Sequence, residues 1–163
     1  MDQLTILCVE DEAEVRDALT RDLAAFVPAL RVEAAEDVDD AKQVMQECAD
    51  DGDPIGLVLC DHVMPGTSGV EFLVELNAAP ATHPIRKVLI TGQAGQEDTI
   101  KAVNEASLDH YIAKPWAVEE LHKVIRDELT TFALENLDNL LPYVSVLDGP
   151  RLLEAVSHRR SDR

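Results

Sequence analysis

Short apolar segments alternate with amphipathic helical patterns along most of this chain, and no other feature of the sequence constrains its fold as strongly. Segments of strand length occur at residues 4–9, 31–35, 56–60, 87–91 and 110–113. Between them, helical patterns occur at residues 12–26, 37–49, 69–78 and 96–106, and a longer one begins at residue 117. Five repeats of strand and helix with short links predict an α/β fold, with a doubly wound five-stranded parallel sheet and helices on both faces.

The hydrophobic content fits one folded domain, and the net charge argues against two classes of partner. The chain has 163 residues, and 46% of them are hydrophobic, which suffices for a substantial core. Its formal net charge of −18 repels nucleic acid and anionic lipid, so we expect neither nucleic acid nor a membrane as a partner. No basic segment precedes the first apolar run, and no run approaches the roughly 18 residues of a membrane span. We therefore expect a cytoplasmic protein whose three widely spaced cysteines are reduced core residues.

Chemically useful side chains stand at the carboxyl ends of four predicted strands. Glu10 and Asp11 follow the first strand, and Asp61 follows the third. Thr91 closes the fourth strand, and Lys114 follows the fifth. Because ligands bind beyond the carboxyl ends of the strands in such sheets, we expect these side chains to share one edge.

This set of groups suits Mg2+ binding and phosphoryl transfer. Crowded carboxylates repel one another unless a proton or a cation relieves them, and Mg2+ prefers hard oxygen ligands. Asp11 and Asp61 are the expected direct ligands, with Glu10 reaching the ion through water. A carboxylate can also act as a nucleophile and form an aspartyl-phosphate, whose oxygens Mg2+, Lys114 and Thr91 would contact. Without Asp61, the acids after the first strand would be better explained as a solvated helix start.

In their order and spacing, these motifs resemble the receiver domain of bacterial two-component response regulators. The matching pieces are the acid pair Glu10-Asp11, the run DHVMPGTSG from Asp61 with Pro65 and Gly69, Thr91 at the end of VLIT, and Lys114-Pro115. The resemblance covers residues 3–126 and implies the flavodoxin-like strand order 2-1-3-4-5.

The resemblance also implies what the site residues do. Asp61 would accept a phosphoryl group from the phosphohistidine of a sensor histidine kinase or a phosphotransfer protein, with Thr91 and Lys114 completing the catalytic set. The Lys–Pro peptide bond is usually cis in this family, in line with the preference of cis bonds for proline. The implied ligands of Mg2+ are Glu10, Asp11, Asp61 and the backbone carbonyl of Val63.

A switch is the further implication of the resemblance. Phosphorylation would draw Thr91 inward, and the switch aromatic Tyr111 would then repack the surface that a downstream target protein reads. Tyr111 could instead be a half-buried aromatic on an edge strand. Val63 and Gln93 stand where receivers tune the access of water to the phosphoryl group, and an apolar Val63 predicts a long-lived phosphoryl group.

The receiver pattern ends near residue 126, so we divide the chain into a receiver domain, 1–126, and a helical C-terminal extension, 127–163. The long helix would continue to Pro142, a second helix would begin near Asp148, and the basic terminal residues would fray. The extension either folds back or meets a second copy as a helical seam, and we expect a homodimer. The residues expected at this seam are Leu129, Phe132, Leu137 and Leu140. The extension is too short for a typical DNA-binding effector, so an effector domain in a longer protein remains an open alternative.

Three alternatives to a phosphorylated switch remain at this stage. Phosphatases of the haloacid-dehalogenase type also form an aspartyl-phosphate, but they carry a second aspartate where this chain has Val63. We therefore expect no turnover enzyme. A pseudo-receiver that binds partners without phosphate and an intermediate of a phosphorelay are the other two alternatives.

Overall fold

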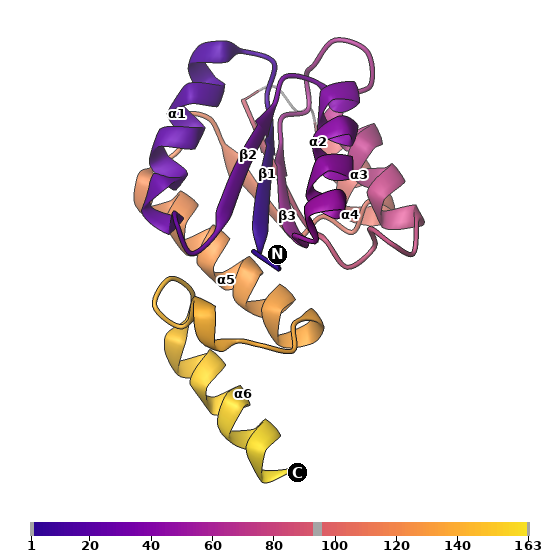
Figure 1. Ribbon diagram of the computed structural model, residues 1–163. Helices are drawn as coiled ribbons and strands as arrows, with labels where there is room; N and C mark the ends of the chain where they lie inside the picture. The colour runs from indigo at the N-terminus through magenta and orange to yellow at the C-terminus, as the bar shows by residue number, and fades with distance from the viewer. Residues whose placement is uncertain (1, 93–95, 163) are drawn as a thin grey trace.

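The computed structural model describes residues 2–92 and 96–162, and the predicted parallel sheet lies at its centre (Figure 1). All neighbouring strands pair in parallel, in the order β2-β1-β3-β4-β5 that the family resemblance implied. The doubly wound five-stranded α/β fold is therefore confirmed. The strands are β1 (Thr5–Val9), β2 (Arg31–Ala35), β3 (Ile55–Cys60), β4 (Arg86–Thr91) and β5 (His110–Ala113).

Helices cover both faces of the sheet (Figure 1). One face carries α1 (Ala13–Leu23) and α5 (Val118–Asn136), and the other carries α2 (Val38–Asp51), α3 (Gly69–Ala78) and α4 (Gln96–Glu105). Alternate residues of β3 enter different cores: Leu57 and Leu59 pack under α1 and α5, whereas Val58 and Cys60 pack under the other three helices. Burial on both faces explains why this strand is apolar without interruption.

Helix α5 ends six residues before the proline that we expected to end it. Its last residue is Asn136, and Leu137 already has an extended backbone with ψ of 139°. The apolar spacing misled the prediction because Leu137 and Leu140 keep helical intervals without being helical. After the turn, a short 3-10 helix, η2 (Leu141–Tyr143), follows, and Leu140 is buried to 1% exposure in the core under α5.

The expectation that the basic terminal residues fray is wrong for residues 158–161, which belong to a helix, while Arg163 lies outside the described residues. Helix α6 runs from Gly149 to Ser161, with the Asp148 side chain accepting a hydrogen bond from the backbone N–H of Arg151 as an N-cap. The guanidinium of Arg159 donates hydrogen bonds to the carbonyl oxygens of Leu134 and Leu137, at 3.0 and 2.9 Å. Arg159 thus satisfies carbonyls that the end of α5 leaves without helical partners.

The extension folds back on the receiver, so the residues assigned to an intermolecular seam are used within the chain. Leu129 and Phe132 on α5 are buried against β3, where Gly56 leaves room for them. A Cβ at Gly56 would lie 2.7 Å from the Leu129 side chain and 3.1 Å from Phe132. The same core continues into the segment after α5, with Leu140, Tyr143, Leu147 and Leu152. The homodimer itself stays a prediction.

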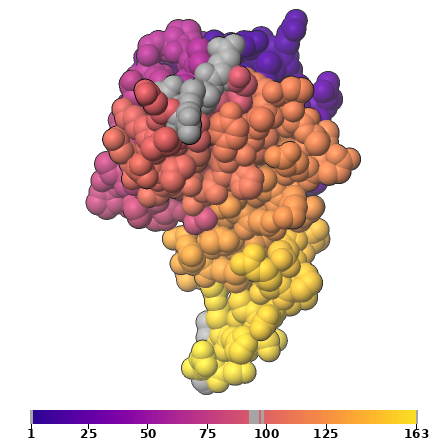
Figure 2. All heavy atoms as spheres, turned by 180° about the vertical axis from the view of Figure 1, so that it is seen from behind, coloured from indigo at the N-terminus to yellow at the C-terminus, as the bar shows by residue number. Residues whose placement is uncertain are grey.

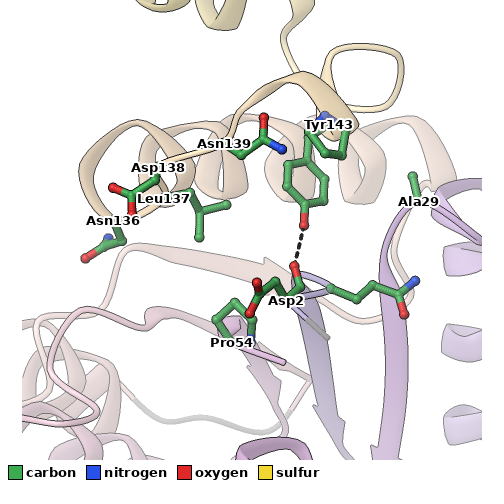
Figure 3. A pocket seen from close by; sticks show the side chains of 10 residues that line it. Asp2, Ala29, Pro54, Asn136, Leu137, Asp138, Asn139 and Tyr143 are labelled. Atoms are coloured by element: carbon green, nitrogen blue, oxygen red, sulfur yellow. Dashed lines mark hydrogen bonds between the residues drawn. The ribbon is translucent and has the colours of Figure 1, made fainter. Parts of the chain in front are cut away.

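Tyr143 fastens the extension to the amino-terminal edge of the sheet. Its hydroxyl donates to the carbonyl of Asp2 at 2.9 Å and accepts from the backbone N–H of Leu4 at 3.0 Å. Asp2 and Tyr143 both line a pocket of about 600 Å³ between the sheet and the extension, and the bond between them is drawn in Figure 3. Among the described residues, no helix is long and apolar enough to cross a membrane.

Candidate phosphorylation site

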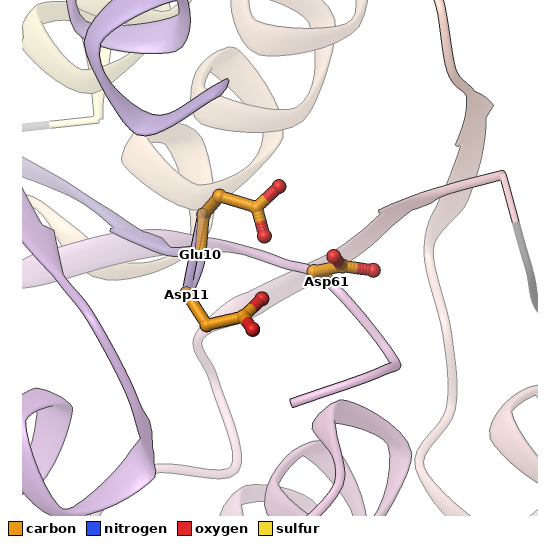
Figure 4. A group of neighbouring side chains, drawn as sticks. All are labelled: Glu10, Asp11 and Asp61. Atoms are coloured by element: carbon orange, nitrogen blue, oxygen red, sulfur yellow. The ribbon is translucent and has the colours of Figure 1, made fainter. Parts of the chain in front are cut away.

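Three carboxylates converge where β1 and β3 end (Figure 4). One oxygen from each of Glu10, Asp11 and Asp61 lies within 4.8 Å of the others. Glu10 is fully buried and Asp61 is 4% exposed, while Asp11 is partly exposed. The structure therefore assembles the acids that the order of the strand ends predicted.

Lys114 supplies the positive charge from the end of β5. Its Nζ lies 2.9 Å from Oδ2 of Asp61 and also donates to Oε1 of Glu10. The peptide bond between Lys114 and Pro115 is cis, as the family resemblance implied. An ammonium group on two buried carboxylates is a strong, charge-assisted contact, and it holds Lys114 at the site without a ligand.

The pKa values follow from burial and from this charge arrangement. Burial, together with the neighbouring Asp61 carboxylate, raises the pKa of Glu10 to about 7, against the lowering effect of Lys114. For Asp61, burial acts to raise the pKa, but interactions with the Glu10, Lys114 and Thr91 side chains outweigh it and lower the pKa. Burial would lower the pKa of Lys114, but its two carboxylate partners raise it. The arrangement therefore keeps Asp61 ionised, as a nucleophile must be.

The loop after Asp61 explains the glycine that follows it eight residues later. A Cβ at Gly69 would lie 1.8 Å from the backbone oxygen of Asp61, so only glycine fits. The N–H of Gly69 donates to the carbonyl of His62 at 2.9 Å, and Ser68 caps α3 by accepting from the N–H of Glu71. The run DHVMPGTSG is thus a loop closed tightly against Asp61.

Thr91 and Tyr111 are linked through the backbone. Thr91 is buried to 1% exposure at the end of β4, and the hydroxyl of the half-buried Tyr111 on β5 donates to the Thr91 carbonyl at 3.1 Å.

Val63 is 48% exposed, and its N–H donates to Oδ1 of Asp61 at 3.4 Å. Gln93 lies outside the described residues.

The donor set fits a hard divalent cation. Oε2 of Glu10 is buried and has no hydrogen-bond partner among the described residues, which is costly for a carboxylate oxygen. Three carboxylates with a single ammonium leave a net negative site, and oxygen ligands are the ones that Mg2+ takes.

Arg16, which no sequence motif marks, holds the acid pair in place. Arg16 on α1 donates from Nη1 to the carbonyl oxygen of Glu10 at 2.9 Å and to that of Asp11 at 3.4 Å. Its only signal was an isolated basic residue in the acidic first turns of a predicted helix. Arg16 binds backbone carbonyl oxygens, which every residue has. The contact therefore requires no particular side chains at residues 10 and 11, and no sequence motif predicts it.

The chain belongs to the response-regulator receiver family. A family model described as "Response regulator receiver domain" matches residues 6–126. Proteins of this family are signalling modules of two-component systems, and phosphorylation on an aspartate is their general function.

The relatives that the chain resembles are longer regulators, and the chain matches only a part of each. It is 35% identical over 133 residues to the hydrogenase transcriptional regulatory protein HoxA of Cupriavidus necator, covering 82% of this chain and 26% of HoxA. It is 32% identical over 137 residues to the phosphate regulon transcriptional regulatory protein PhoB of Escherichia coli, covering 81% of this chain and 56% of PhoB. The chain thus spans a quarter to about half of the length of these proteins.

Solved structures agree on the fold. A CheY-like receiver domain protein from Methanospirillum hungatei superposes with a TM-score of 0.71 at 24% identity, covering 83% of this chain and all of that one. A signal receiver domain of an HD domain-containing protein from Pseudomonas fluorescens gives the same TM-score at 23% identity, covering 85% and 96%.

Proposed function

We propose that Asp61 is the phosphoryl acceptor of this receiver and that a partner's phosphohistidine is the donor. An Asp61 carboxylate oxygen attacks phosphorus, the phosphorus–nitrogen bond of the donor breaks, and the electron pair returns to the imidazole. The observation that carries this proposal is the contact of a buried, ionised Asp61 with Lys114 at 2.9 Å beside two further acids.

The surrounding residues would stabilise the transferred group. Lys114 would move from its carboxylates to one phosphoryl oxygen, and the Thr91 hydroxyl would bond a second. Glu10, Asp11, Asp61 and the Val63 carbonyl would hold Mg2+, which neutralises charge on the transferring group when it is bound. These roles are supported by the convergence of the three carboxylates (Figure 4) and by the contacts of Lys114 with Asp61 and Glu10.

The switch would pass from the site to a protein-binding surface. Movement of Thr91 toward the phosphoryl group would break or shift the hydrogen bond from Tyr111 to the Thr91 carbonyl. Tyr111 on β5 packs against the core cluster that contains Ala102 of α4, and on α4 Ile100 and Val103 are each more than half exposed. We propose that a downstream target protein reads this surface in the cytoplasm, and that the chain modifies only itself rather than turning over substrate.

Intact-mass spectrometry after incubation with acetyl phosphate, with and without Mg2+, tests the acceptor. We expect a gain of one phosphoryl group only with Mg2+ and none in Asp61→Asn. Asp11→Asn should need a higher Mg2+ concentration than the parent chain to reach the same phosphoryl labelling. Glu14 is an exposed acid in the first turn of α1, and Glu14→Gln should be labelled like the parent chain. Full labelling of Asp61→Asn would refute the assignment of the acceptor.

A histidine kinase distinguishes the remaining alternatives. A chain that is labelled neither by acetyl phosphate nor by a panel of phosphorylated kinases would be a pseudo-receiver. Transfer of the label from Asp61 to a histidine of another protein would make it a phosphorelay intermediate. Release of inorganic phosphate from added phosphomonoesters would contradict the absence of turnover.

A further inference from the structure

Helix α6 projects from the body and presents an exposed face (Figures 1 and 2). Leu153 is 50% exposed, and Leu141 in η2 is 59% exposed. A hollow of about 370 Å³ lies on this face, lined at helical intervals by Leu153, Val156, Ser157, Arg160 and Ser161. Two serines and one arginine line this hollow beside the half-exposed Leu153, while Val156 also packs partly against the core of its own chain. A half-exposed leucine beside an arginine offers both an apolar and a charged contact to a partner.

The charge of α6 is opposite to that of the body. Residues 149–163 contain four arginines against one glutamate and one aspartate, whereas the whole chain has a net charge of −18. Arg159 is used within the chain, at the end of α5. Arg160 lies on the exposed face. Its positive charge favours a partner with an acidic surface.

A groove of matching character lies at the amino-terminal edge of the sheet. It has a volume of about 540 Å³, and its apolar lining includes Met45, Ala49, Ile55, Ile85 and Phe132. Asp2 lines both this groove and the adjoining pocket of Figure 3, which also contains Asp138. The lining residues all come from elements other than α6.

We propose that α6 of a second copy occupies this groove. Each copy would insert its α6 into the groove of the other, while α6 keeps its contacts with its own chain. Leu153 would bury against the apolar lining, and Arg160 would approach Asp2. A second copy is the occupant that fits because the basic apolar helix and the acidic apolar groove lie at the same end of one chain. A twofold axis at that end covers both surfaces of both copies at once.

Sedimentation equilibrium of the full chain tests this interface. We expect a reversible dimer, measured at one fixed NaCl concentration, because salt also screens the repulsion between two chains of net charge −18. Leu153→Glu on α6 and Ala49→Arg in the groove should each weaken the dimer by at least about tenfold. Gln43→Arg, on an exposed part of α2 outside the groove, and Val103→Glu on α4 are matched controls that should leave the dimer unchanged.

A mixture of the two interface variants gives the decisive reading. Leu153→Glu retains an intact groove and Ala49→Arg retains an intact α6, so together they should form a heterodimer that neither forms alone. A mixture that stays monomeric would overturn the groove as the binding site of α6, and an Ala49→Arg variant that dimerises like the parent chain would place α6 against α6. A chain that is monomeric at all concentrations, or a dimer lost only in Val103→Glu, would overturn the whole proposal. None of these outcomes depends on phosphorylation.

Discussion

At the scale of single residues, the buried carboxyl of Glu10 makes the stability of the chain depend on pH. Its pKa is about 7 in the folded chain and 4.5 ordinarily, so between these values the folded chain binds more protons than the unfolded chain. The contribution of Glu10 to stability is therefore greatest below pH 4.5 and is lost as the pH rises to 7. A cation beside Glu10 would remove the cause of this loss.

Urea unfolding without Mg2+, followed by the fluorescence of Trp116, measures this effect. We expect the free energy of unfolding to fall between pH 5 and pH 8 by up to about 3 kcal/mol, at about 1.36 kcal/mol for each pKa unit. Mg2+ should restore more stability at pH 8 than at pH 5. Glu10→Gln should flatten the profile, and parallel profiles for the variant and the parent chain would contradict this role of Glu10.

Gly56 is the residue on which the close approach of α5 to β3 depends. In Gly56→Ala, the added Cβ would meet Leu129 and Leu4 at 2.7 Å, so we expect a loss of about 1–3 kcal/mol from overpacking. Gly92→Ala is the matched control, because a Cβ there meets only Lys114 atoms, at 3.7 Å. Chemical denaturation compares the two, and an equal stability for both variants would show that α5 can shift at no cost.

At the scale of elements, the sequence predicted the strands and the sheet edge better than the end of α5. Asp61, Thr91 and Lys114 could be placed together because Thr91 ends a strand and the other two follow one, and parallel strands end at one edge. The end of α5 depends instead on Arg159, which lies 22 residues beyond Leu137 and satisfies its carbonyl. A contact with backbone carbonyls at that separation leaves no periodic trace in the sequence, and the same holds for Arg16 at the site.

Tyr143 is the element-scale test of how the extension is attached. In Tyr143→Phe, the Leu4 N–H and the Asp2 carbonyl lose their partner, and the Leu4 bond is buried. We expect a loss of about 1–3 kcal/mol in the free energy of unfolding, the usual cost of an unsatisfied buried group. Tyr111→Phe loses a single, part-buried bond and should cost less. A larger loss in Tyr111→Phe than in Tyr143→Phe would contradict this ranking.

At the scale of the whole molecule, the extension and the receiver share one core. The residues under α1 and α5 form a single cluster that runs from β1 to α6, and α5 crosses residue 126 without a break. The apolar pattern correctly identified the extension residues that need burial, but it could not say whether the covering surface belonged to the same chain. The covering surface includes Gly56, whose lack of a side chain makes room for Leu129 and Phe132. A pattern of apolar residues does not reveal such a space.

Truncation tests the division of the chain at residue 126. A chain ending there loses Leu129 and Phe132, which cover β3, along with the apolar residues after α5. Full burial of each large apolar side chain is worth about 1.5–3 kcal/mol, and domains have only about 5–15 kcal/mol in total. We therefore expect the 1–126 chain to be unfolded or molten. A chain ending at Asn136 keeps α5 but loses Tyr143 and Leu152, so it should fold with a lower melting temperature. Far-UV and near-UV circular dichroism during heating distinguish these states, and a 1–126 chain that melts like the full chain would establish the extension as an independent unit.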